Sequence, residues 1–287
     1  MQSLALPDQT VEAVDRTARL LQEHPFAVLT GAGISTDSGI PAYRGAGAPP
    51  RAKPMTIQMY LSDEAARRRY WLGGHLGYRA FTTPDPNGGH RALASLERSG
   101  AATGVVTQNV DGLHLRAGSR RVVELHGTMH RTLCLHCGQV YDRRAIAERI
   151  ERLNPWILVP ENIVLNPDGD VSPESTEGFV IPSCEICEGM LKPDVVYFGE
   201  FVPTARFALA ESLVHASSAL VVAGTSLTVN SGIRVIERAR RRGMPIVIVN
   251  HEPTRADDWA DEVIAGGTTE VLTALAARLG SLRGALA

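Results

Sequence analysis

The sequence predicts an α/β fold, in which a doubly wound, Rossmann-like domain with a parallel sheet carries a smaller domain formed by two insertions. Three observations predict it. Short apolar runs recur along the chain and end in glycine or polar residues. Two of these runs flank a helical stretch near the C-terminus, and all four cysteines lie in one segment between the α/β parts. Strands that alternate with helices indicate a parallel sheet.

The first expected elements are a helix and a strand. Apolar residues at positions 11, 14, 18 and 21 recur every three or four residues, which is one face of an amphipathic helix. Residues 26–30 form a short apolar run that ends in Gly31, Ala32 and Gly33. A strand followed by such a glycine turn is typical of the start of a nucleotide-binding α/β unit.

Two more strands are expected before the cysteines, and both end in polar residues. Residues 105–107 read as a buried strand that leads to Gln108, Asn109 and Asp111. Residues 122–125 read as another, which leads to His126. Polar side chains therefore gather at the carboxyl ends of the expected strands.

The C-terminal part reads as a βαβ unit. Residues 219–223 are expected to form a strand, residues 233–242 a helix that Gly243 stops, and residues 246–249 a strand that ends at Asn250. A strand, a helix and a second strand in this order imply parallel pairing.

The chain is expected to divide into one discontinuous domain and two insertions. Residues 1–50, 91–127 and 193–287 would form the Rossmann-like domain. Residues 51–90 combine charged residues in a helical pattern with aromatic residues and would form a helical insertion. Residues 128–192 hold every cysteine and would form the second insertion.

The cysteines form two C-x-x-C pairs, Cys134 with Cys137 and Cys184 with Cys187. Four thiolates fill the tetrahedral shell of Zn²⁺ and leave no position for water, so a structural zinc ion in a zinc-ribbon insertion is expected. Two disulfides are disfavoured in a reducing compartment. A redox pair is disfavoured because neither pair follows a strand at the start of a helix, and His136 would be a bystander.

The glycine turn has two of the three glycines of G-x-G-x-x-G, with Thr36 at the third position. A dinucleotide-binding dehydrogenase places an acid about 20 residues further on, yet no Asp or Glu occurs between Asp37 and Asp63. The sequence therefore argues against a dehydrogenase. It indicates a turn whose backbone N–H groups approach a phosphate at a helix N-terminus, the alternative being a tight turn without a ligand.

Composition excludes some function classes. The 287 residues include 29 Lys and Arg against 31 Asp and Glu, which gives a net charge of -2. A dedicated nucleic-acid binder usually carries a basic face, and this charge balance does not indicate one. No run of about 18 apolar residues is long enough for a bilayer. Asp8, Glu12 and Asp15 lie where a signal peptide would be cationic and then apolar. We expect a cytoplasmic protein without membrane or nucleic-acid partners.

Several segments, in the same order, resemble the motif set of the sirtuins. The matching segments are residues 31–45, 107–114, 124–127, the two C-x-x-C pairs, 192–200, 224–226 and 249–250. Residues 166–170 and 253–258 are similar to the class II branch that includes a mitochondrial lipoamidase.

The resemblance implies an NAD-dependent protein-lysine deacylase that acts on acetyl, long-acyl or lipoyl groups and yields nicotinamide, O-acyl-ADP-ribose and free lysine. Acyl-lysine proteins or peptides would be its partners. His126 would be the general base toward a ribose hydroxyl, since imidazole titrates near neutrality. Asn109 and Asp111 would share the catalytic pocket.

The resemblance also assigns binding residues. The residues expected to bind NAD are Gly31, Ala32, Gly33, Ser35, Thr36, Tyr43, Arg44, Gln108, Asn109, Val110, Asp111, Gly224, Thr225, Ser226, Asn250, His251, Glu252 and Thr268. The residues expected to pair with the substrate peptide are Val195, Val196, Tyr197, Phe198 and Gly199. A buried strand is the competing interpretation of this last segment.

Two features bear on activity. Ala42 stands where the family commonly has Asp, which predicts a lower rate or a shifted reaction preference. Desuccinylating sirtuins use a Tyr-x-x-Arg pair for the acyl carboxylate, but Tyr60, Tyr70 and Tyr78 have no arginine three residues later. Weak succinyl and malonyl activity is therefore expected.

Three other functions are alternatives. A protein mono-ADP-ribosyltransferase would use the same NAD pocket. A non-catalytic module for NAD or acyl-lysine is favoured only by Ala42. A zinc-ribbon interaction protein would leave four residues without a role: Gln108, Asn109, Asp111 and His126.

Overall fold

The computed structural model describes residues 6–42, 54–158, 165–166 and 169–284. Its α-helices are α1 (Asp8–Leu21), α2 (Ile57–Ser62), α3 (Glu64–Thr82), α4 (Gly88–Arg98), α5 (Leu113–Arg116), α6 (Arg143–Leu153), α7 (Thr204–His215), α8 (Asn230–Arg241) and α9 (Thr268–Gly284). Its strands are β1 (Phe26–Thr30), β2 (Ala102–Thr107), β3 (Val122–Glu124), β4 (Gly127–Cys134), β5 (Val140–Asp142), β6 (Leu191–Val195), β7 (Ala219–Ala223), β8 (Ile246–Asn250) and β9 (Glu262–Ala265). Two 3-10 helices are η1 (Ala32–Ser38) and η2 (Asp257–Trp259).

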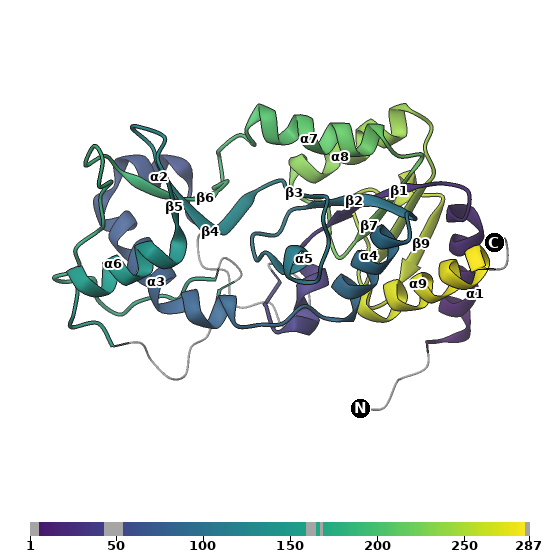
Figure 1. Cartoon of the computed structure of the whole chain (residues 1–287), viewed down its shortest axis with the longest axis horizontal. Helices are drawn as coiled ribbons and strands as arrows, with labels where there is room; N and C mark the ends of the chain where they lie inside the picture. The colour runs from purple at the N-terminus through teal and green to yellow at the C-terminus, as the bar shows by residue number, and fades with distance from the viewer. Residues whose placement is uncertain (1–5, 43–53, 159–164, 167–168, 285–287) are drawn as a thin grey trace.

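The larger sheet has six strands in the order β3-β2-β1-β7-β8-β9, and every pairing is parallel. If these strands are numbered by their order in the chain, the order is 3-2-1-4-5-6, which is that of the Rossmann fold. The direction of the winding reverses between β1 and β7 in the middle of the sheet (Figure 1). In such sheets, ligands bind at the carboxyl ends of the strands at this switch point.

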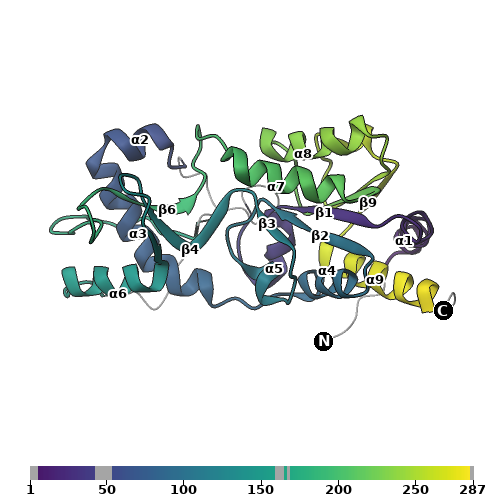
Figure 2. The same ribbon diagram turned by 45° about the horizontal axis from the view of Figure 1, so that its top comes forward.

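Helices cover both faces of this sheet, so its strands are apolar on both sides. Side chains alternate along a strand: Phe26 and Val28 pack with α1, α4 and α9, whereas Ala27 and Leu29 pack with α7 and α8. The two helical layers lie on opposite sides of the sheet (Figure 2). This arrangement confirms the predicted doubly wound sheet.

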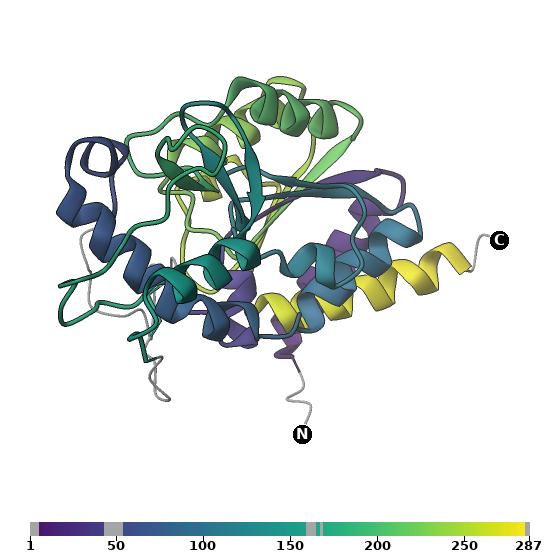
Figure 3. The same cartoon turned by 60° about the vertical axis from the view of Figure 1, so that its left-hand side comes forward.

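The second unit is built on an antiparallel sheet with the order β5-β4-β6. It lies beside α2, α3 and α6 at one end of the molecule (Figure 1), the end that comes forward in Figure 3. β6 is an edge strand of this sheet. It also crosses the boundary expected after residue 192, because Lys192 and Pro193 pair with β4.

Most predicted elements lie where the sequence placed them. The expected strands match β1, β2, β3, β7 and β8, and the two expected helices match α1 and α8. After the glycine turn the chain forms the short 3-10 helix η1 instead of an α-helix. Among the described residues, no helix is long and apolar enough to cross a membrane.

Candidate functional site

Two glycine turns meet at the switch point, one after β1 and one after β7. The N–H of Gly31 donates to the carbonyl of Ala223 (3.2 Å), and the N–H of Gly33 donates to that of Gly224 (2.8 Å). A Cβ at Gly33 would lie 2.9 Å from the Gly224 Cα, so the turns approach too closely for a side chain. These two N–H groups donate within the protein, and the binding of a phosphate by the backbone of this turn stays a prediction.

A buried polar network lies at the carboxyl ends of β1 and β2. The Ser35 hydroxyl donates to Asp111 Oδ2 (2.7 Å), and Asn109 Nδ2 donates to Ser35 Oγ (3.0 Å) and to the Gly31 carbonyl (3.1 Å). Asp111 Oδ1 accepts from the N–H of Leu113 (2.9 Å). Ser35, Asn109 and Asp111 are 1%, 9% and 4% exposed. The hydrogen bonds therefore fix an amide and a carboxylate, separated in sequence from the glycine turn, in one rigid group.

His126 follows β3 and is held by both ring nitrogens. Nδ1 lies 2.9 Å from the carbonyl oxygen of Gln108, and Nε2 lies 2.7 Å from Ser231 Oγ. Burial lowers the pKa of His126 to about 4; the Gln108 carbonyl opposes this shift and Arg206 adds to it. His126 is therefore neutral near pH 7 and can accept a proton.

Gln108 connects this histidine to the turn after β7. Its Oε1 accepts a hydrogen bond from the Thr225 hydroxyl (2.8 Å), while its carbonyl holds His126. Three of the residues predicted from separate strand ends, Gln108, His126 and Thr225, are therefore brought together.

Other residues predicted to bind NAD differ in their surroundings. Thr268 begins α9, is buried, and has its hydroxyl 3.5 Å from the Gly33 carbonyl. Asn250 ends β8 and donates from Nδ2 to the Glu252 carbonyl (2.7 Å), whereas the side chains of His251 and Glu252 are exposed. Tyr43 and Arg44 lie outside the described residues.

The predicted peptide-binding segment lies next to His126. The N–H of Val196 donates to the His126 carbonyl (2.8 Å), and the Phe198 carbonyl accepts from Ile57 (3.0 Å). Tyr197 packs with Tyr60, at 5.1 Å between ring centroids, while Phe198 is 45% exposed. The segment thus combines buried and exposed positions, and it continues from the edge strand β6. Its role in binding the peptide stays a prediction.

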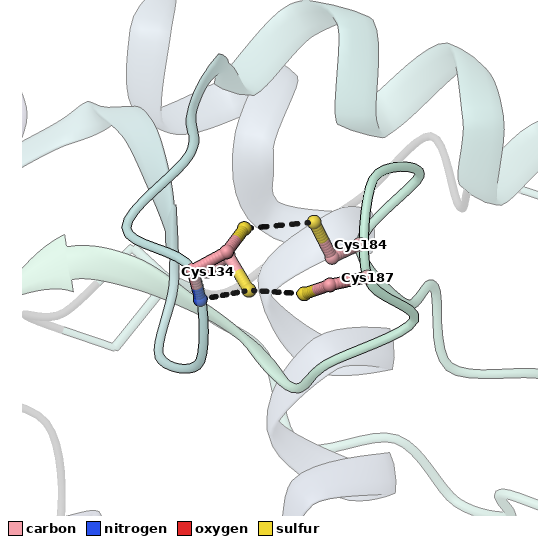
Figure 4. Close-up of side chains that lie close together, drawn as sticks. Cys134, Cys184 and Cys187 are labelled. Carbon is pink, nitrogen blue, oxygen red and sulfur yellow. Dashed lines mark hydrogen bonds between the residues drawn. The ribbon is translucent and has the colours of Figure 1, made fainter.

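The four cysteines converge in the second unit (Figure 4). All four sulfur atoms lie within 4.8 Å of one another, with Cys134 and Cys187 at 3.5 Å and Cys137 and Cys184 at 3.6 Å. A zinc tetrahedron with Zn–S bonds of about 2.3 Å has S–S edges of about 3.8 Å. A disulfide requires about 2.05 Å. The donor set fits one four-coordinate zinc ion.

Sequence reasoning missed several residues that contact the site. Ser231 touches His126, and His130 Nε2 lies 3.2 Å from the Asp111 carbonyl oxygen. His114 is 1% exposed, and its Nε2 lies 2.9 Å from the hydroxyl of Thr30, the last residue of β1. No sequence signal identified Ser231, because it lies on a helix whose orientation depends on tertiary packing.

The Sir2 family model matches residues 31–231. The chain belongs to the Sir2 family. It is 50% identical over 261 residues to NAD-dependent protein deacetylase 1 of Mycobacterium avium, which covers 90% of this chain and 92% of that protein. It is 45% identical over 240 residues to the NAD-dependent protein lipoamidase sirtuin-4 of Bos taurus. This match covers 81% of this chain and 76% of that protein. The second match agrees with the predicted class II branch.

Solved Sir2 structures have the same fold. A structure of Sir2 enzymes superposes with a TM-score of 0.75 at 32% identity, covering 95% of this chain and 99% of that chain. A complex of Sir2 with a p53 peptide and NAD⁺ superposes with a TM-score of 0.73 at 30% identity, covering 94% and 98%. The fold of this Sir2-family chain and the predicted family are both confirmed.

Proposed function

We propose that this Sir2-family chain is an NAD-dependent protein-lysine deacylase. Its products are nicotinamide, O-acyl-ADP-ribose and free lysine. The observation that carries the proposal is the neutral imidazole of His126 beside the buried Ser35, Asn109 and Asp111 network at the switch point of the sheet. The names of the relatives, which include NAD-dependent deacetylases and deacylases, support the same activity.

The residues around the crevice have distinct proposed roles. NAD supplies an electrophilic ribose carbon and nicotinamide as the leaving group. Asn109 and Asp111 offer an amide and a carboxylate that orient the carboxamide and hydroxyl groups of the dinucleotide. His126 accepts the proton of a ribose hydroxyl at Nε2, while the Gln108 carbonyl holds Nδ1–H. The glycine turns and the ends of β7 and β8 hold the rest of NAD.

The acyl-lysine peptide is proposed to bind along residues 195–199. β6 is an edge strand, and an extended peptide beside it would be held mainly by backbone hydrogen bonds, largely independent of its sequence. Two relatives of known structure are described as complexes with a p53 peptide and with a myristoylated histone peptide, and they support this partner class.

One structural Zn²⁺ is proposed at Cys134, Cys137, Cys184 and Cys187, where it ties the two C-x-x-C pairs together.

The division of the chain into residues 1–50, 91–127 and 193–287 with insertions 51–90 and 128–192 stays our proposal. Its one change is that β6 is assigned to the second insertion, because β6 pairs with β4.

The proposal is tested by nicotinamide release from NAD by the purified protein, with acetyl-, long-acyl- and lipoyl-lysine peptides compared in parallel. Release that requires an acyl peptide, forms O-acyl-ADP-ribose and falls at least 100-fold in H126A supports deacylation. H215Q, which changes an exposed histidine at the end of α7, is the matched control and keeps full activity. Release without peptide, with ADP-ribose retained on protein, would instead identify the transferase, which the names of the relatives do not favour.

Acyl preference is a separate prediction. α3 carries Tyr70 and Tyr78, and neither is followed three residues later by the arginine of the Tyr-x-x-Arg pair that holds an acyl carboxylate in desuccinylating sirtuins. We expect kcat/KM for succinyl-lysine peptides to be at least tenfold below that for acetyl-lysine peptides of the same sequence. Equal values for the two peptides would contradict this expectation.

A further inference from the structure

The imidazole of His126 is held in one tautomer by its two neighbours. A backbone carbonyl only accepts hydrogen bonds, so the contact of 2.9 Å with the Gln108 oxygen places the hydrogen on Nδ1. Nε2 of the neutral ring then carries the lone pair. The Ser231 hydroxyl, 2.7 Å away, therefore donates to Nε2. Ser231 thus contacts the ring atom that the proposed reaction uses as a base.

The first turn of α8 is shaped around this pair. Ser231 is the second residue of the helix and is 9% exposed, so its hydroxyl points into the protein. The next residue, Gly232, faces the side chain of Gln108: a Cβ there would lie 3.0 Å from Gln108 Nε2. Two consecutive residues of α8 thus serve His126, one by a direct hydrogen bond and the other by leaving space for the residue that holds Nδ1.

We propose that Ser231 is a positioning residue for His126, which fixes the plane of the imidazole and keeps Nε2 as the acceptor until a ribose hydroxyl takes its place. The inference rests on the proposed deacylase function. The proton of the ribose O–H moves to Nε2. Nδ1 keeps its hydrogen, which stays hydrogen-bonded to the Gln108 carbonyl, and Ser231 keeps its own proton throughout. The hydroxyl of Ser231 can then accept from the protonated ring, since a serine oxygen both donates and accepts.

The kinetic test compares S231A and S231T with the unchanged protein. Loss of one orienting hydrogen bond lowers kcat of S231A for deacylation about tenfold, with KM for NAD and for peptide changed less than twofold. S231T keeps a hydroxyl and recovers most of kcat. S281A removes an exposed serine hydroxyl on α9 and serves as the matched control, with unchanged kcat.

A second readout follows the ring itself. Spectra of protein labelled with ¹⁵N-histidine are expected to show His126 protonated at Nδ1, with an Nε2 resonance that moves in S231A and returns in S231T. Unchanged kcat and an unmoved Nε2 resonance in a folded S231A protein would overturn the inference. If the unchanged protein does not deacylate at all, the proposed function fails, while the ¹⁵N spectra still decide whether Ser231 orients the ring.

Discussion

His126 is neutral at physiological pH because its surroundings penalise the charged ring. Burial is the largest cause of its lowered pKa, and the positive charge of Arg206 acts in the same direction. Arg206 itself pairs with Asp194 at 2.8 Å, and Arg131 pairs with the same carboxylate at 2.9 Å. The ring is therefore deprotonated at pH 7, and its pKa of about 4 also makes it a weaker base than the histidine titrating near neutrality that the sequence predicted.

This environment predicts the pH dependence of the reaction. With a pKa of about 4, His126 loses its basic form only in acid, so the acidic limb of kcat/KM is expected below pH 5 instead of near pH 6.5. R206Q removes a positive charge and moves this limb to higher pH, while R131Q, which affects the same carboxylate, moves it less. A limb near pH 6.5 in the unchanged protein would contradict the prediction.

At this scale, sequence reasoning found residues that follow strands and missed residues that lie on helices. Asn109, Asp111 and His126 were predictable because the carboxyl ends of parallel strands meet at one edge of the sheet. Ser231 was not, because the direction of a helical side chain depends on how α8 packs against the sheet.

The contact between the turns after β1 and β7 gives a prediction for these elements. A methyl group at Gly33 would meet the Gly224 backbone at 2.9 Å, so G33A must separate the two turns. We expect a loss of about 1–3 kcal/mol in the free energy of unfolding and a Kd for NAD at least tenfold weaker. Urea unfolding and calorimetry of NAD binding measure the two effects.

Gly74 provides the matched control for this change. It lies within α3, and a Cβ there would meet no atom within 4 Å. G74A therefore adds helix propensity without a clash and is expected to stabilise the protein by about 0.5–1 kcal/mol. If G33A and G74A had the same effect on stability, the close approach of the two turns would not explain the glycine at position 33.

Zinc removal is predicted to act on the second unit first. Cys134 ends β4, Cys137 lies on the loop to β5, and Cys184 and Cys187 lie on the segment that precedes β6, so a metal bound there would fix the ends of this sheet. A chelator, or C137S, is expected to abolish hydrogen-exchange protection in β4 and β6 while β1 and β7 stay protected. Unchanged protection of β4 after complete zinc removal would show that the sheet does not depend on the metal.

The elements of the large sheet were more predictable than those of the small one. The inner strands β1 and β7 of the large sheet are buried on both faces, which produces the continuous apolar runs at residues 26–30 and 219–223. β4 mixes buried and exposed positions, and its partner β6 lies far along the chain. A pattern along the sequence does not specify such a pairing, whereas the spacing of the cysteines did predict the metal site.

The molecule as a whole buries several histidines in neutral form. Burial lowers the pKa of His75 and His90 to about 4 and that of His114 well below its usual value. In the unfolded chain these rings bind protons below about pH 6.5. Between pH 6.5 and 4 the unfolded state therefore binds more protons, so acid favours unfolding.

We therefore expect the free energy of unfolding to fall as pH drops below 6.5, by up to about 1.4 kcal/mol per pH unit for each histidine. Urea unfolding at pH 7, 6 and 5 measures this slope. Both ring nitrogens of His75 are buried without a hydrogen-bond partner in the described part of the chain. H75L is therefore expected to reduce the slope of unfolding free energy against pH by the contribution of about one proton. H215Q, at an exposed position, leaves it unchanged. A stability independent of pH over this range would contradict the expectation.

The winding of the large sheet also determines the order in which the protein can assemble on the ribosome. β1, β2 and β3 are synthesised early, but β7, which pairs with β1, follows only after the whole zinc-binding segment and β6. The small sheet can therefore close while the large one still has half its strands. At roughly 5–20 residues per second, the nascent chain presents the open edge of β1 for several seconds. Because an open strand edge pairs readily with other chains, soluble expression is expected to depend on a chaperone that shields β1 during translation.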